Sequence, residues 1–204
     1  MPIHQHPDQV NRALNHIEWL QEHFPNVTLE RVELTAVFDG MIKALPSANE
    51  QSAEMALVNT RARIRMTTLY YFAALKGMLV AGTGNKVEDF GIGFFTKYGD
   101  GGVDLSPIAD LNKTQVYAVA EDLGVGQEII DAPPTDGLWG DDRTDADQIG
   151  ATYPELEWAM EFTGDETETT AREREVLAIY RRLNQANKHK MEPIPVCVIP
   201  RELK

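Results

Sequence analysis

The feature that most constrains this chain is a glycine-rich stretch that follows a short apolar run. Residues 78–81, Met-Leu-Val-Ala, predict a short buried strand. The next four residues, 82–85, read Gly-Thr-Gly-Asn, a turn whose backbone can approach a ligand closely. Lys86 and Glu88 follow at once, and the stretch 94–104 is too rich in glycine for a helix. Together these features predict a ligand site at the carboxyl end of a strand in an open α/β sheet, with an ordinary surface loop as the alternative.

Length and composition indicate one globular domain over residues 1–204. The chain is 43% hydrophobic and 25% charged, which is ordinary for a folded domain with a real core. No apolar run approaches the roughly 20 residues that cross a bilayer, and the N-terminus lacks the order of a secretory signal. The single cysteine, Cys197, excludes an internal disulfide. We expect a buried, inert thiol there and a cytoplasmic protein.

The net charge of −13 limits the class of partner. A field of that sign repels nucleic acid and anionic membranes, so we expect neither as a partner. The same field repels an anionic nucleotide. A nucleotide site in this chain therefore needs its own local cluster of cations.

Hydrophobic periodicity predicts five helices and a further strand along the rest of the chain. Residues 132–147 carry no periodic pattern, and irregular segments of that length are usually lids or disordered. The predicted helices are Asp8–Phe24, Glu54–Lys76, Leu111–Gly124, Tyr153–Glu161 and Thr170–Asn187, and a further strand is expected within Val27–Val37.

The helix over residues 111–124 begins with an unusual cation. Asn112 is a credible N-cap, with Gln115 in the position of a capping box. Lys113 then occupies the first helical position, where a cation opposes the helix dipole. The misfit makes sense if Lys113 and the free N–H groups of the first turn share an anion. A poorly placed surface lysine is the alternative.

Other cations also allow two interpretations. In the helix over residues 54–76, Arg61 and Arg65 share one flank and Arg63 lies on the other, so each fits a solvated face or a site. Lys188 to Lys190 close the last helix, where cations stabilise the dipole and need no functional explanation.

The glycine-rich stretch resembles one family. Gly-Thr-Gly-Asn-Lys-x-Glu at 82–88, followed by Phe-Phe-Thr-Lys-Tyr-Gly-Asp-Gly-Gly-x-Asp at 94–104, is similar to ammonia-dependent NAD synthetase. The resemblance runs from about Pro7 to about Lys190. It implies an α/β fold, a doubly wound parallel sheet flanked by helices, of the adenine-nucleotide α-hydrolase-like group. It also implies a homodimer that uses free ammonia, because no glutaminase domain is attached.

The resemblance implies a reaction that needs no protein nucleophile. ATP adenylates the carboxylate of nicotinic acid adenine dinucleotide (deamido-NAD), and ammonia then attacks the acyl-adenylate to give NAD, AMP and pyrophosphate. The enzyme has to place two anionic substrates and cancel their charge. By resemblance, Glu88 is a magnesium ligand, Thr83, Lys113 and Thr135 bind ATP, and Arg63, Lys97, Asp104, His189 and Lys190 bind deamido-NAD.

These residues supply the local cluster of cations that a nucleotide site in this acidic chain needs, since five of the nine are cationic or can become so. The glycines at 99, 101 and 102 would let the loop backbone lie against the substrate. No catalytic residue in the strict sense is implied.

One departure from the family is large. Its members begin with a strand that ends in Ser-Gly-Gly-x-Asp-Ser, a loop that holds the pyrophosphate of ATP and a second magnesium carboxylate. That strand, its helix and the loop are missing from these residues, which fits a fragment, a start assigned to an internal Met, or a natural truncation. We expect weak ATP binding and apolar sheet edges exposed by the loss.

Two rival functions stay open. One is another ATP-using amidase or thiolase of the same fold that acts on a nucleotide or tRNA, although the net charge argues against tRNA. The other is an inactive remnant that binds dinucleotide, or dimerises with an intact copy, without turnover.

Overall fold

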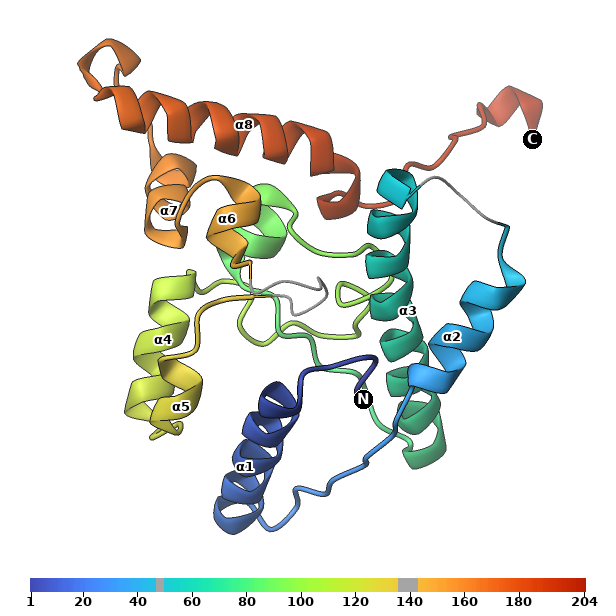
Figure 1. Ribbon diagram of the computed structural model, residues 1–204. Coiled ribbons are helices and arrows are strands. Elements are labelled where there is room, and N and C mark those ends of the chain that lie inside the picture. The colour runs from blue at the N-terminus through green and yellow to red at the C-terminus, as the bar shows by residue number, and fades with distance from the viewer. Residues whose placement is uncertain (47–49, 136–142) are drawn as a thin grey trace.

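The computed structural model describes residues 1–46, 50–135 and 143–204. Figure 1 shows helices around a long irregular connection between α3 and α4. None of the helices in the described residues is both long enough and apolar enough to cross a membrane. The elements are α1 Pro7–His23, α2 Thr35–Ala44, α3 Glu50–Lys76, the π-helix η1 Lys86–Ile92, α4 Lys113–Asp122, α5 Gln127–Ile130, α6 Asp145–Ile149, α7 Tyr153–Glu161, η2 Glu166–Glu168, α8 Ala171–Met191 and η3 Arg201–Leu203.

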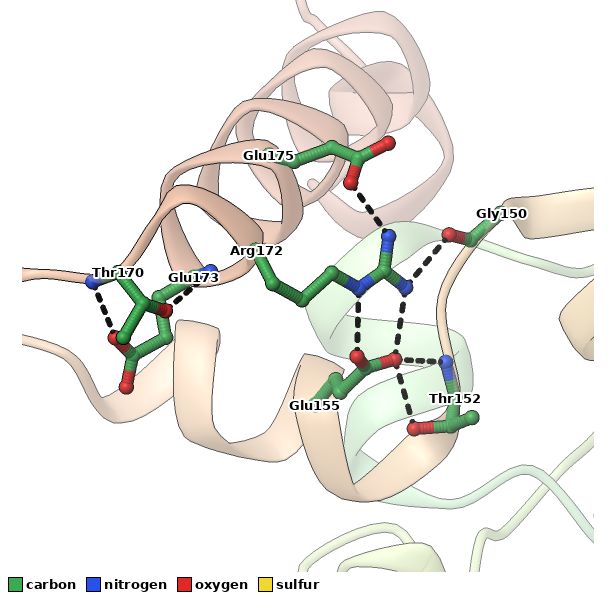
Figure 2. A network of polar contacts seen from close by, with 7 residues as sticks. All are labelled: Gly150, Thr152, Glu155, Thr170, Arg172, Glu173 and Glu175. Carbon is green, nitrogen blue, oxygen red and sulfur yellow. Dashed lines mark hydrogen bonds and ion pairs between the residues drawn. The ribbon is translucent and has the colours of Figure 1, made fainter.

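The five helices expected from periodicity are confirmed as α1, α3, α4, α7 and α8. Their starts follow local capping signals. The backbone N–H of Asn112 donates to Gln115 Oε1 at 2.8 Å and starts α4. At the start of α8, Thr170 N donates to the Glu173 carboxylate at 2.7 Å and Glu173 N donates back to Thr170 Oγ1 at 3.2 Å (Figure 2).

The strand expected within Val27–Val37 is wrong: residues 27–34 form no regular element, and α2 begins at Thr35. The Glu33 carboxylate accepts the Thr35 backbone N–H at 3.1 Å, and this supports the first turn. Leu34, Phe38 and Ile42 recur every four residues, and this places them on one helical face with Phe38 almost fully buried.

Two further expectations fail. Residues 132–147 are not irregular throughout, since α6 begins at Asp145 with Thr144 as its N-cap; residues 136–142 of that segment lie outside the described part of the chain. Cys197 is exposed rather than buried. It lies in the tail after α8, where residues 192–204 are all exposed, because no described element covers this tail.

The predicted strand at 78–81 is present only as a single parallel bridge. Ala81 pairs with Leu105, the sole β-pairing in the described residues. Backbone bonds from Gly82 N to Leu105 O (2.8 Å) and from Asp104 N to Val80 O (2.9 Å) accompany it. Of residues 78–81 only Val80 is buried, so the expectation of a buried strand is wrong for the rest of the run.

Two hydrophobic clusters hold the described residues together. The smaller one joins the N-terminal segment to α2 and consists of Ile3, Leu34 and Phe38. The larger one lies where η1, α7 and α8 meet, and consists of Val87, Ile92, Ile149, Ala151, Tyr153, Leu156, Ala159, Val176 and Leu177. The glycine-rich segment thus sits directly on the main core, and its position depends on α7 and α8.

An arginine network joins α7 to α8 (Figure 2). Arg172 binds Glu155 in a bidentate pair, with Nε–Oε1 at 2.8 Å and Nη2–Oε2 at 3.0 Å, and also contacts Glu175 at 2.8 Å and Gly150 O at 3.1 Å. Glu155 also accepts the Thr152 backbone N–H at 2.8 Å. The Arg172 hydrogen bonds, and then the Thr152 bond, lower the pKa of Glu155 to about 2.

Truncation of the main core should destabilise the fold. Leu156 is fully buried in the larger cluster, so Leu156→Ala should lower the free energy of unfolding by about 2–5 kcal/mol through lost burial and a cavity. Leu123→Ala is the matched control, because Leu123 is 64% exposed. Urea denaturation measures both variants. An equal loss of unfolding free energy in the two variants would contradict the assignment of Leu156 to the main core.

Acid should weaken the α7–α8 junction through Glu155. Its folded pKa lies below its ordinary value of 4.5, so its contribution to stability is complete above that pH and is lost as pH falls toward about 2. Glu155→Gln should therefore be less stable at neutral pH and lose less stability across this window. Melting temperatures between pH 6 and 2.5 test this, with Glu161→Gln on the same helix as control. An unchanged acid dependence in Glu155→Gln would refute it.

Candidate functional site

Glu88 is held by the residue that starts η1. Asn85 is 1% exposed, and its Oδ1 accepts the backbone N–H groups of Val87 at 3.1 Å and Glu88 at 3.0 Å. Its Nδ2 donates to the Glu88 carboxylate. Asparagine is a preferred N-cap, so the sequence contains a signal for this role. One buried side chain therefore fixes both the helix start and the carboxylate.

The other end of η1 is capped by side chains from α8. Asn184 Nδ2 donates to Gly91 O at 2.8 Å, Asn187 Nδ2 to Ile92 O at 2.9 Å, and Lys190 Nζ to the next carbonyls, Gly93 O at 2.6 Å and Phe95 O at 2.7 Å. The three donors are three residues apart and share one face of α8. They satisfy carbonyls that a helix end leaves without an internal partner.

Gly93 is required where η1 ends. Its φ is +62°, a left-handed conformation that favours glycine. A Cβ there would also lie 2.5 Å from Asn187 Cβ. The contact between the end of η1 and α8 thus leaves no room for a side chain.

A cavity of about 460 Å³ opens beside Glu88. Its lining includes Glu88, Lys113 and Thr135, three residues that the resemblance assigns to magnesium and ATP. They come from η1, from the first position of α4 and from the connection after α5. Arg12 of α1 and Asp145 of α6 also line it, and the sequence did not point to either.

The charges in the cavity are partly paired. Lys113 Nζ lies 2.6 Å from Glu88 Oε1, and the ammonium sits 4.9 Å from the centroid of the Tyr153 ring, within cation–π range. The Tyr153 hydroxyl donates to Asp145 Oδ2 at 2.6 Å. Burial, and then the nearby carboxylates of Glu88 and Asp145, raise the pKa of Tyr153 strongly. Tyr153 is therefore a neutral hydrogen-bond donor.

The start of α4 is anchored to α7 rather than left free for an anion. Glu157, only 9% exposed, accepts the Thr114 backbone N–H at 3.0 Å and the Thr114 hydroxyl at 2.7 Å. An anion shared by Lys113 and first-turn N–H groups was one of two interpretations of this lysine; in the structure Glu157 accepts one of these N–H groups and Glu88 pairs with Lys113. Sequence gave no sign of Glu157, because its partner lies 43 residues away.

A second group of predicted residues gathers where α3 meets the end of α8. Arg63 Nε and Nη2 both donate to Lys97 O at 3.3 Å, and Lys97 Nζ donates to His189 O. Lys190 follows and holds the carbonyls of residues 93 and 95. These four residues are neighbours, but none is among the residues that line the cavity.

The remaining two predicted residues, Asp104 and Thr83, lie close in sequence to the β-bridge between Ala81 and Leu105. The Asp104 carboxylate accepts the Val80 backbone N–H at 2.8 Å and the Tyr70 hydroxyl at 3.1 Å, so it supports the β-bridge. Thr83 is exposed in the turn after Ala81. Neither lines the cavity.

The loop glycines face protein. A Cβ on Gly101 would lie 2.3 Å from the Phe95 ring, and one on Gly99 2.8 Å from Ala62 of α3. A Cβ on Gly102 would lie 3.0 Å from the Met66 side chain. Packing of the loop against itself and α3 therefore favours glycine at 99 and 101 and leaves little room for a side chain at 102.

Comparison with known proteins gives the family. A family model described as NAD synthase matches residues 1–194. The chain is 36% identical over 200 residues to the NH(3)-dependent NAD(+) synthetase of Alkaliphilus metalliredigens, with 96% of this chain and 77% of that protein covered. It is 40% identical over 160 residues to the enzyme of the same name from Carboxydothermus hydrogenoformans, with 78% and 62% covered.

Comparison with solved structures points to the same family as comparison of sequences. NMN synthetase from Francisella tularensis superposes with a TM-score of 0.77 at 25% identity, and 97% of this chain and 74% of that one are covered. The NH3-dependent NAD synthetase from Campylobacter jejuni, in complex with nitrate, gives 0.61 at 27% identity, with 82% and 64% covered. The chain spans 62% of the Carboxydothermus protein and 48% of the Methanococcoides burtonii one. By sequence and by fold, this chain is a member of the NAD synthase family.

Proposed function

We propose that the protein is an ammonia-dependent ligase that converts deamido-NAD into NAD with ATP and magnesium. The observation that carries this proposal is the cavity beside η1. Glu88, Lys113 and Thr135, which come from three separate elements, line it together. Lys113, whose side chain is 21% exposed, faces this cavity in a chain with a net charge of −13, and it would offer positive charge to an anionic ligand once Glu88 binds a metal ion.

The proposed reaction divides the described residues into two groups. Thr83, Lys113 and Thr135 hold ATP. Arg63, Lys97, Asp104, His189 and Lys190 hold deamido-NAD. The substrate carboxylate oxygen attacks the α-phosphorus of ATP and pyrophosphate leaves; ammonia then attacks the acyl carbon, a proton is lost, and AMP departs. The protein supplies placement and charge rather than a nucleophile.

Glu88 is the residue proposed to hold magnesium. Magnesium commonly takes one or two carboxylates and completes its shell with substrate phosphates and water, so one well-placed carboxylate fits. Within the described residues no group of three or more His, Cys, Asp or Glu side chains is placed to hold a metal. When bound, the ion neutralises phosphate charge. Glu88 and Lys113, now paired at 2.6 Å, would then face the metal and a phosphate respectively.

We also propose the finer architecture of the family for this chain. The parallel bridge between Ala81 and Leu105 supports a doubly wound parallel sheet, and further strands are needed to complete it. Met78 and Leu79 are 63% and 69% exposed, and consecutive side chains of a strand point to opposite faces of a sheet, so helices on the two faces of the complete sheet would cover them. A cytoplasmic homodimer is part of the same proposal.

A mononucleotide is the second candidate substrate. Of the two solved structures described above, the one named NMN synthetase has the higher TM-score, 0.77, and covers 97% of this chain. That similarity favours an activity in which ammonia amidates nicotinic acid mononucleotide. Side-by-side assays with the mononucleotide and the dinucleotide decide between the two, because kcat/KM ranks competing substrates.

The assay also separates the enzyme from a non-catalytic remnant. Formation of the amide product that requires ATP, magnesium and ammonia together supports the ligase. Calorimetric binding of deamido-NAD with neither ATP binding nor turnover supports the remnant and refutes the proposed activity. The 204-residue chain is used throughout.

Loss of the Glu88 carboxylate should remove turnover without weakening the binding of the dinucleotide. Glu88→Gln should lower kcat by on the order of a hundredfold or more, because a preorganised charge at the phosphates is lost. Binding of deamido-NAD, which the proposal places on other residues, should stay within about twofold of the parent. Glu121→Gln, an exposed change on α4, is the control. Full activity in Glu88→Gln would exclude the assigned role.

A further inference from the structure

The polar face of α1 borders the cavity beside Glu88. Gln9 and Arg12, three residues apart, share one face of α1 and both line the cavity, as does Gln5 just before the helix. The sequence alone did not single out this face. In the structure it forms a wall of the candidate site.

This wall is held in place by contacts outside the cavity. Arg65 of α3 donates from Nη2 to Gln5 Oε1 at 3.1 Å and from Nε to Met1 O at 3.1 Å. Further along α1, Asn15 Nδ2 donates to Glu128 of α5 at 3.1 Å. Figure 1 shows α1 below the irregular connection, with α5 beside it. Arg12 lies between these anchors along the chain.

The charged side chains that line the cavity differ in whether they contact a partner among the described residues. Lys113 is paired with Glu88 at 2.6 Å, and the Asp145 carboxylate accepts the Tyr153 hydroxyl at 2.6 Å. Arg12 has no ion pair or hydrogen bond with any residue in the described ranges. An arginine that lines a cavity and has no carboxylate partner among the described residues, in a chain of net charge −13, is available to bind an external anion.

We infer that Arg12 binds a phosphate group of a nucleotide in this cavity. A guanidinium presents a planar fork of donors that matches two phosphate oxygens, and it stays charged at every physiological pH. The phosphate belongs either to ATP or to the pyridine nucleotide. The inference rests on the proposed function for the identity of these ligands, and it adds a direct anion contact from α1 that the family motifs did not include.

Calorimetric titration of the 204-residue chain and its variants tests the inference. ATP with magnesium, deamido-NAD, and pyrophosphate are titrated separately into the parent chain, Arg12→Gln, Arg12→Lys and Arg182→Gln. Arg182 is an exposed arginine on α8, so its variant makes the same change in net charge away from the cavity. Circular dichroism and melting temperature confirm that each variant is folded.

Arg12→Gln should lower the affinity for the ligand whose phosphate Arg12 binds by about tenfold to a hundredfold, as expected for the loss of a charge-assisted bidentate contact. Arg12→Lys should fall between Arg12→Gln and the parent, and Arg182→Gln should stay within about twofold of the parent. If only the affinity for ATP falls, Arg12 contacts a phosphate of ATP. If only the affinity for deamido-NAD falls, Arg12 contacts a phosphate of the pyridine nucleotide.

Two outcomes overturn the inference. One is an affinity of Arg12→Gln equal to that of Arg182→Gln for every probe, and the other is a parent chain that binds none of the three probes. The proposed function fails separately: a parent chain that binds ATP but shows no turnover refutes the ligase and leaves the Arg12 contact standing. Conversely, turnover with no effect of Arg12→Gln refutes only the contact.

Discussion

The structure depends on a set of side-chain hydrogen bonds from α8 to the end of η1. Asn184, Asn187 and Lys190 donate to carbonyls that the π-helix leaves without a partner. Buried carbonyls without partners are costly, so these bonds fix where η1 ends and where the glycine-rich loop begins. Because Glu88 lies on η1, the same bonds determine where the candidate metal ligand stands relative to the cavity.

A short helix connects this core to the candidate site. Leu156 of α7 is fully buried in the main cluster, whereas Tyr153 and Glu157, four residues apart, face the start of α4. Tyr153 lies under the Lys113 ammonium, and Glu157 holds the residue that follows Lys113. Packing in the core thereby holds the Lys113 ammonium in a fixed position, as the proposed site for two anionic substrates requires.

Much of the local structure and part of the site follow from sequence. The helices with a clear period and a capping signal were predicted closely, because both signals act within about four residues. The motif resemblance selected Glu88, Lys113 and Thr135, and the structure brings them to one cavity. By contrast, Arg12 and Glu157 carry no local signal, since what makes each of them important is a neighbour far away along the chain.

The sequence by itself determined the family, the main helices with their caps, and the residue types needed to bind phosphates in an acidic protein. Only the tertiary structure decided how charges are paired: that Glu88 pairs with Lys113, that Glu157 accepts hydrogen bonds at the start of α4, and that Arg12 has no carboxylate partner among the described residues. The physical reason is that helix period and capping are short-range properties of the chain, whereas the electrostatics of a site depends on distances between side chains that folding alone brings together.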